Sequence, residues 1–416
     1  MVPTCWGQLC TRWWRPAPQH TSTVSRSSSS SIAVRDSTCV SVASVARELD
    51  QELAAAMQQE ICSGNEAAAC CDLMSLRLVT WNVWFGSRMP LCRWQALLIE
   101  ALQTDPHVLC LQEVTEKFLE LLLASSWIKS RFAFSTEGLT QAYDVIMLVR
   151  KDLQPSWWSV SIPTCMGRSC LVADLVCRDG TLIRVANVHL ESCRENAGLR
   201  LAQLDTLLLA IDPWSSSEMV STRHDALMLC GDFNFCASWP ENERLANSGF
   251  SDLWPLLHGN EPGFTEDTAL NSMLLEEKGC QKQVRFDRVL LRTPEAQFME
   301  NERWQPLTMV LLGKEPCPNA SGGALLWPSD HLGVYAELAA PASRRGAPQD
   351  SPLKVVLPPE ETLPVGGQIA KEQKRVYANE EMRQEEEEEG KEEREEEQDE
   401  EEQEQEEQEE EEQEEQ

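Results

Sequence analysis

The chain has 416 residues and a formal net charge of −32 at pH 7. Between residues 380 and 416 it has 25 acidic and 3 basic residues, so this tail alone carries a charge of −22. A segment made almost entirely of Glu and Gln cannot bury enough apolar surface to fold. The overall charge excludes long-range attraction to nucleic acid, although it leaves room for a short basic groove.

The first 72 residues are predicted to be a disordered leader with one short amphipathic helix. Residues 1–35 contain four arginines, a serine run and no acid, which is the composition of an organelle transit peptide and equally of a plain disordered leader. Residues 42–62 follow with apolar residues at helical spacing, and this helix is a candidate for binding a partner. We expect an intracellular protein, in the nucleus, and the leader keeps a mitochondrial or plastid destination open.

Residues 73–340 form one large domain by size, in which strand-like apolar runs alternate with two helical patterns. The helical patterns cover 94–101, which Pro106 closes, and 195–211. The runs at 171–177 and 182–190 have a short turn between them and predict a hairpin. The strand-like runs are 76–84, 108–114, 145–149, 171–177, 182–190, 226–230, 284–291 and 331–338. Hairpins mixed with helical crossovers favour an α/β or α+β fold.

The C-terminal end continues with a Pro/Gly-rich linker over 341–379 and the acidic tail over 380–416. For the tail we expect either a solubilising role or contact with basic protein partners. The 16 cysteines include no Cys-x-x-Cys pair, and several lie inside apolar runs, so they predict a reduced, intracellular protein without a zinc ribbon. No apolar run is long enough to span a bilayer, and we expect no membrane association and a monomer.

Polar side chains follow or precede six of the predicted strands. The motifs are Trp81-Asn82, Gln112-Glu113, His189-Leu190-Glu191-Ser192, Gly231-Asp232-Phe233-Asn234, Arg285-Phe286-Asp287-Arg288 and Pro328-Ser329-Asp330-His331. One such ending is an ordinary turn, but six in succession predict strand ends that converge on one polar site. Acids, amides and histidines without a nucleophilic Ser or Cys suit a hard divalent cation and a phosphate substrate.

In this order, the six motifs resemble the endonuclease/exonuclease/phosphatase superfamily over residues 76–338, and in detail its 5′-tyrosyl-DNA phosphodiesterase branch. The resemblance implies a four-layer α/β sandwich with two mixed sheets face to face and helices outside. It also implies metal-dependent hydrolysis of 5′-phosphotyrosyl bonds at DNA ends, as in the removal of trapped topoisomerase II adducts in DNA repair.

The resemblance further implies three sets of site residues. The catalytic set is Asn82, Asp232, Asn234, Asp287 and His331. The substrate-binding set is His189, Ser192 and Arg168, and the metal set is Glu113 and Asp330, for Mg²⁺ with Mn²⁺ as an alternative. Asp232 matches the residue that orients or deprotonates the attacking water, and His331 matches the donor to the scissile phosphate, oriented by Asp287.

Three positions depart from the branch. Trp84 stands where the animal enzymes have an acid, Cys236 stands where they have an arginine, and Tyr143 is the nearest match to a shifted aromatic residue. Two alternatives therefore stay open. The first is another phosphoesterase of the superfamily: an apurinic-site endonuclease, a phosphoinositide phosphatase or a sphingomyelinase-like enzyme. The second is a non-catalytic, acidic-tailed binding protein, against which the retention of the acids and of His331 argues.

Overall fold

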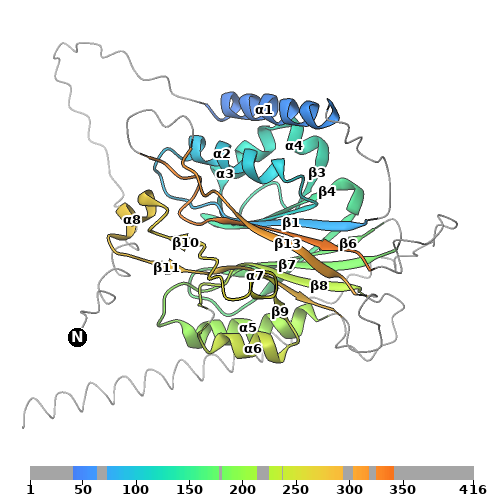
Figure 1. Ribbon diagram of the computed structural model, residues 1–416, viewed down its shortest axis with the longest axis vertical. Coiled ribbons are helices and arrows are strands. Elements are labelled where there is room, and N and C mark those ends of the chain that lie inside the picture. Colours follow the sequence, from blue (N-terminus) through green and yellow to red (C-terminus); the bar gives the residue numbers. More distant parts are fainter. Residues whose placement is uncertain are drawn as a thin grey trace, which may run out of the picture. The chain divides into compact units, whose positions relative to one another are not determined.

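The computed structural model describes residues 41–62, 73–177, 180–212, 224–236, 238–293, 303–317 and 325–341. Two six-stranded sheets lie face to face, and helices cover the outer side of each (Figure 1). This arrangement confirms the four-layer α/β sandwich with two mixed sheets. Residues 1–40, most of the linker and the acidic tail lie outside the described residues, so the predictions made for them stay predictions.

The first sheet has a parallel pair at its centre and antiparallel strands on both sides. Its spatial order is β13 (Gln305–Leu312), β14 (Gly333–Ala339), β1 (Ser75–Asn82), β2 (Val108–Thr115), β4 (Tyr143–Arg150) and β3 (Phe132–Phe134). Strands β1 and β2 run parallel, and the other neighbours are antiparallel. The carboxyl ends of β1 and β2 therefore lie at the same edge.

The second sheet repeats this pattern. Its spatial order is β5 (Pro155–Ser161), β6 (Ser169–Val176), β7 (Leu182–His189), β8 (Ala226–Asp232), β12 (Asp287–Arg292) and β9 (Ser251–Asp252). Strands β7 and β8 are parallel, and the others pair antiparallel. The predicted hairpin over 171–190 is confirmed as the β6–β7 pair.

Side chains that alternate along the central strands build the core on both faces of each sheet. In β1, Leu78 points into the cluster between the sheets, whereas Val79 points to the helices outside. In β8, Met228 faces the inner cluster and Leu229 the outer one. Burial on both faces explains why these strands are continuous apolar runs in the sequence.

Helices close the outer faces and the edges. The first sheet is covered by α2 (Pro90–Gln103), α3 (Glu116–Ala124) and α4 (Ser126–Arg131), and the second by α5 (Ala197–Ile211) and α6 (Glu241–Asn247). The remaining elements are η2 (Lys151–Leu153), α7 (Leu253–His258), β10 (Glu266–Asp267), α8 (Ser272–Lys278) and β11 (Gln283–Val284). Among the described helices, none is long and apolar enough to cross a membrane.

The predicted helix at 42–62 is present as α1 (Val42–Cys62), and it packs on this domain. Leu49 and Leu53 are buried in the same cluster as side chains of α2 and α3. Asp50 accepts hydrogen bonds from the backbone N–H groups of Ser126 and Trp127, at 3.0 and 3.2 Å, at the start of α4. The apolar face of α1 is therefore covered by this chain, and the folded unit extends beyond the boundary predicted at residue 73.

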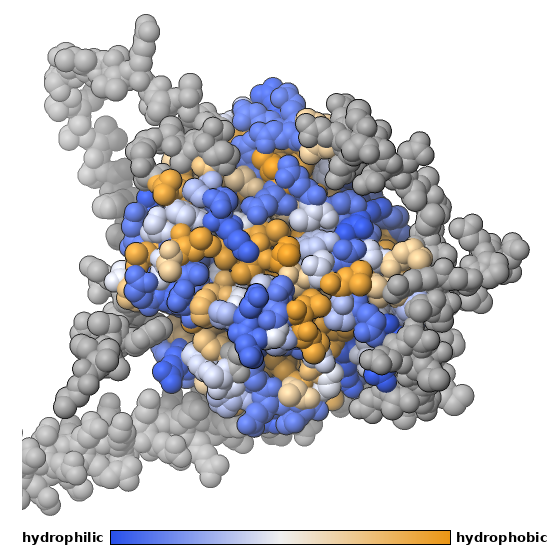
Figure 2. All heavy atoms as spheres, viewed as in Figure 1, coloured by the Kyte–Doolittle hydropathy of each residue, from blue (hydrophilic) through white to orange (hydrophobic). Residues whose placement is uncertain are grey.

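The surface on the side shown in Figure 1 mixes hydrophilic and hydrophobic residues in small groups (Figure 2). Exposed apolar side chains include Leu307 and Val310 of β13, which is an edge strand of the first sheet. Scattered exposed apolar residues are common on soluble domains. The feature that distinguishes this molecule is instead the set of buried charged residues at the ends of the central strands.

Candidate active site

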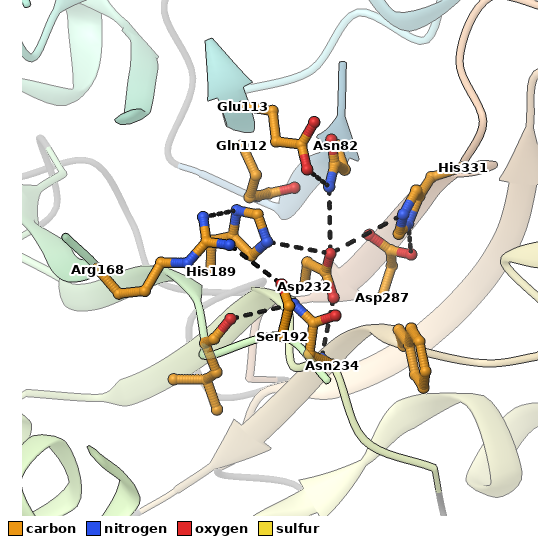
Figure 3. A network of polar contacts seen from close by, with 12 residues as sticks. Asn82, Gln112, Glu113, Arg168, His189, Ser192, Asp232, Asn234, Asp287 and His331 are labelled. Atoms are coloured by element: carbon orange, nitrogen blue, oxygen red, sulfur yellow. Dashed lines mark hydrogen bonds and ion pairs between the residues drawn. The ribbon is translucent and has the colours of Figure 1, made fainter. Parts of the chain in front are cut away.

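The predicted site residues gather where the ends of β1, β2, β7 and β8 meet the starts of β12 and β14 (Figure 3). The strand register explains this gathering. Asn82 pairs with Gln112 across β1 and β2, and Asp232 pairs with His189 on one side and with Asp287 on the other. Asp232 therefore lies in the middle of the second sheet's contribution to the site.

Asp232 is buried and is held by contacts on both carboxylate oxygens. Its Oδ2 accepts a hydrogen bond from Asn82 Nδ2 at 3.1 Å and lies 3.5 Å from His189 Nε2. Its Oδ1 accepts from the backbone N–H of Asn234 at 2.9 Å, and Asn234 Nδ2 in turn donates to the carbonyl of Leu190 at 3.0 Å. Burial and the nearby charge of Asp287 raise the pKa of Asp232 to about 6, a value suited to a base that works near neutral pH.

Glu113 lies opposite, at an irregularity in β2. The β2–β4 register shifts between residues 111 and 114, and Glu113 has a φ of 58°, a conformation that turns its side chain out of the regular alternation. It accepts from Asn82 Nδ2 at 3.2 Å and from the backbone N–H of Phe85 at 3.3 Å. Burial and the carboxylate of Asp330 raise the pKa of Glu113 to about 7.

His331 is enclosed by carboxylates. Its Nδ1 lies 2.8 Å from Asp287 Oδ2, and its Nε2 lies 3.2 Å from Glu266 Oε1 and 4.0 Å from Asp232 Oδ2. Burial lowers the pKa of His331, but the neighbouring carboxylates of Asp287 and Asp330 outweigh burial and hold its pKa well above the usual value. The imidazole is therefore a cation that presents N–H groups on both sides.

Arg168, His189 and Ser192, the predicted substrate-binding set, touch one another. Arg168 Nη1 lies 2.9 Å from His189 Nδ1, and its Nη2 donates to Ser192 Oγ at 3.1 Å. Burial and the charge of Arg168 lower the pKa of His189 well below its usual value, so the ring is neutral. Since Nδ1 accepts from Arg168, the proton of His189 is on Nε2 and points toward Asp232.

A small pocket lies beside this set. It is lined by Tyr143, Arg168 and His189 together with residues 144–145, 167 and 169. The ring of Phe85 stacks on Tyr143 with centroids 4.8 Å apart, and the guanidinium of Arg168 lies 5.4 Å from the centre of the Tyr143 ring. Tyr143, the nearest match to the branch's aromatic residue, thus borders the site.

A buried amide bridge beneath the site joins the two sheets. Gln112 of β2 donates to Asn187 Oδ1 of β7 at 2.7 Å, and Asn187 Nδ2 donates to the carbonyls of Leu111 and Ile146 at 3.2 and 3.0 Å. These hydrogen bonds leave Gln112 Oε1 buried and without a hydrogen-bond partner among the described residues, and Gln112 lies beside Glu113 and His189 in the site (Figure 3). They fix the position of the first sheet relative to the second.

Three charged residues of the site were not predicted from the sequence. Glu266 lies in the short strand β10, Lys278 at the end of α8, and Lys282 just before β11. Lys278 Nζ lies 4.0 Å from Asp330 Oδ2, and Lys282 pairs with Glu266. This segment has neither alternation nor helical periodicity over a useful length, so the sequence carries no signal for where it lies.

The side chains fit a hard divalent cation. Two groups, Asp232–Asp287–His331 and Glu266–Asp330–His331, have candidate ligand atoms within 4.8 Å of one another. Because His331 is protonated, the carboxylates of these groups are the members that could bind the cation. The second oxygen of Asp287 is buried and has no hydrogen-bond partner among the described residues. Buried carboxylates crowded together, as the raised pKa of Glu113 beside Asp330 shows, are the donor chemistry that Mg²⁺ and Mn²⁺ prefer.

Known proteins resemble this chain in sequence and fold. Tyrosyl-DNA phosphodiesterase 2 of Mus musculus is 26% identical over 280 residues, 64% of this chain and 67% of the relative. The Xenopus laevis protein of that name is 29% identical over 56% of this chain and 57% of the relative, so the match spans between half and two thirds of these relatives. The crystal structure of D. rerio TDP2 with a single-strand DNA product shares the fold, at a TM-score of 0.52 and 24% identity over 64% of this chain and 99% of that one.

The family model described as "Endonuclease/Exonuclease/phosphatase family" matches residues 79–331. This match begins within β1 and ends at His331, so it contains all ten predicted site residues. The chain therefore belongs to the endonuclease/exonuclease/phosphatase family.

Proposed function

We propose that this protein is a divalent-metal-dependent phosphodiesterase that hydrolyses 5′-phosphotyrosyl bonds at DNA ends. The observation that carries the proposal is that four polar residues meet at one edge of the paired sheets. Asn82 donates hydrogen bonds to Glu113 and Asp232, and His331 Nε2 lies 4.0 Å from Asp232 Oδ2. The relatives named tyrosyl-DNA phosphodiesterase 2 support the choice of substrate.

In this proposal Asp232 orients the attacking water and takes its proton. The hydrogen bonds from Asn82 Nδ2 and the Asn234 backbone hold the carboxylate in place, and its pKa of about 6 leaves it ionised at neutral pH. Glu113 and Asp330 would hold Mg²⁺, or Mn²⁺ in its place. The bound cation would supply Lewis-acid stabilisation of the charge on the phosphoryl oxygens.

His331 donates a hydrogen bond to the phosphoryl group as negative charge develops on it. Asp287, at 2.8 Å from Nδ1, keeps the ring protonated and fixes its orientation. Arg168, with its partners His189 and Ser192, provides further donors from the second sheet. Tyrosine is a good leaving group because its phenol has a pKa near 10, so the site does not need a strong general acid.

A panel of substrates tests the proposal. A 5′-tyrosyl oligonucleotide, an abasic duplex, a phosphoinositide and sphingomyelin are offered at equal concentration with Mg²⁺, and with EDTA as the control. We expect turnover of the first substrate only, with release of free tyrosine and a 5′-phosphate, and no turnover with EDTA. Preference for another substrate would replace the branch assignment with one of the other phosphoesterases, and inactivity on all of them would favour the binding protein.

The biological setting belongs to the same proposal. We propose action in the nucleus on trapped topoisomerase II adducts, as a monomer, with the acidic tail in contact with basic proteins. Fluorescent fusions of the full chain and of a chain without residues 1–40 would test the destination. A nuclear signal in both fusions is expected, whereas a mitochondrial or plastid signal that depends on residues 1–40 would assign a transit peptide.

A further inference from the structure

The β10–β11 hairpin brings two opposite charges to the site. Glu266 of β10 pairs with Val284 of β11, and the backbone N–H of Lys282 donates to Thr268 Oγ1 at 2.7 Å. Thr265 Oγ1 accepts from the backbone N–H groups of residues 286 and 287, at 3.1 and 3.2 Å. The hairpin is therefore tied to the start of β12, beside Asp287.

The Glu266 carboxylate bridges two cations. Its Oε1 lies 3.2 Å from His331 Nε2, and its Oε2 pairs with Lys282 Nζ. The Glu266 side chain is 4% exposed and that of Lys282 is 15% exposed. Lys282 Nζ also lies 4.9 Å from the centre of the Phe286 ring, which restricts where the ammonium can go. Two donors, one of them the predicted phosphate donor, thus converge on a single anionic group.

The two oxygens of a phosphoryl group can accept hydrogen bonds from the same pair of donors as the two oxygens of a carboxylate. We infer that Lys282 is a further substrate-binding residue, which together with His331 binds the 5′-phosphoryl group, and that Glu266 occupies these donors until the phosphoryl group takes its place. This inference rests on the proposed function and extends its substrate-binding set.

A purely structural role for the pair would have different consequences. If Lys282 only neutralised Glu266, its loss would leave a buried unpaired carboxylate and lower stability without changing the preference for a terminal phosphate. If Lys282 binds the phosphoryl group, the two partners must act in opposite directions: loss of Lys282 weakens phosphate binding, and loss of the Glu266 charge strengthens it. A folding defect cannot produce a gain of affinity.

The test compares binding of two phosphorothioate-linked single strands that differ only in a 5′-phosphate or a 5′-hydroxyl end. Binding to the full-length protein with Mg²⁺ is followed by fluorescence anisotropy. We expect Lys282→Ala to weaken binding of the phosphate strand about tenfold, as for one charge-assisted contact, and to leave the hydroxyl strand unchanged. Lys282→Arg should stay within about threefold of wild type because it keeps the charge. Lys117→Ala, an exposed lysine on α3, is the matched charge control.

Glu266→Gln should bind the phosphate strand more tightly than wild type. The inference is overturned if Lys282→Ala binds the two strands as wild type does, if it loses both strands equally, or if Glu266→Gln weakens the phosphate strand. Wild-type turnover of a 5′-tyrosyl oligonucleotide is measured in parallel. If the wild type does not turn over this substrate, the proposed function is wrong. If the wild type turns it over but Lys282→Ala binds the phosphate strand as the wild type does, only the role of Lys282 is wrong.

Discussion

A substitution at Leu49 tests whether α1 is part of the folded domain. Its side chain has an exposed fraction of 0% and belongs to the cluster formed with α2 and α3. Leu49→Ala removes apolar contacts and leaves a cavity that surrounding side chains fill only in part. Fully buried leucines lose about 2–5 kcal/mol on this substitution, and we expect about 3 kcal/mol here.

Urea denaturation of the full-length protein measures this loss. With an m-value of about 3 kcal/mol/M, the midpoint should fall by about 1 M urea without a change in slope. Glu52→Ala, at an exposed position of the same helix, should change the free energy of unfolding by less than about 0.5 kcal/mol. Equal midpoints for the two variants would refute the packing of α1 on the domain.

The packing of α1 on the domain also affects fragments of the chain. All predicted site residues lie within 73–340, so this fragment is expected to be active. It lacks α1, however, and exposes the surfaces of α2 and α3 that Leu49 and Leu53 cover. A fragment over 41–341 should therefore unfold at a higher urea concentration than one over 73–340, with the same kcat.

Four further predictions concern the site, the core and the tail. Asp232→Asn should lower kcat by about 10²-fold or more. In the wild type, kcat/KM should fall about tenfold per pH unit below the Asp232 pKa of about 6, because only the ionised carboxylate can take a proton. Glu113→Gln should weaken Mg²⁺ binding, measured by calorimetry, and lower the rate together with it; unchanged binding would remove Glu113 from the metal site. Burial, with Arg77 and Arg150 nearby, lowers the pKa of His107 to about 2. Below about pH 6.5 the unfolded chain therefore binds a proton that the folded chain does not, and the free energy of unfolding falls as the pH drops. His107→Asn should reduce this fall, and an identical pH profile for the variant and the wild type would contradict the prediction. Removal of residues 380–416 should leave kcat within about tenfold, or about 1.4 kcal/mol of transition-state stabilisation.

The central strands could be predicted because they are buried on both faces. The apolar run at 226–230 matches β8 to within two residues, and its polar ending marks Asp232 as a site residue. The edge strands β5 and β13 were not predicted. Most of their side chains are partly or fully exposed and polar residues interrupt both strands, so residues 309–312 are the longest apolar run in β13. The predicted strand over 284–291 is in fact β11 and β12, because the chain leaves the small hairpin at Arg285 and enters the second sheet at Asp287.

The site could be predicted only where it follows the strands. A two-residue strand pair brings Glu266 to His331 and Lys282 to Glu266, and the sequence pattern does not reveal this pair. The charge around Cys236, which stands where the branch has an arginine, also depends on residues that are distant in the sequence. Burial raises the pKa of its thiol, whereas Arg288 and Lys282 act in the opposite direction. Positive charge is thus present near the position where the branch has an arginine, although it comes from other parts of the chain.

The site is divided between the two sheets. Glu113 ends a strand of the first sheet and Asp232 a strand of the second, and Asn82 donates to both carboxylates. The side chains packed between the sheets, such as Met147 and Met228, therefore act as a spacer that sets the gap across which a phosphodiester must fit. A substitution deep in this layer, remote from any reacting atom, would change the width of that gap, so the volume of the core is itself a determinant of catalytic competence.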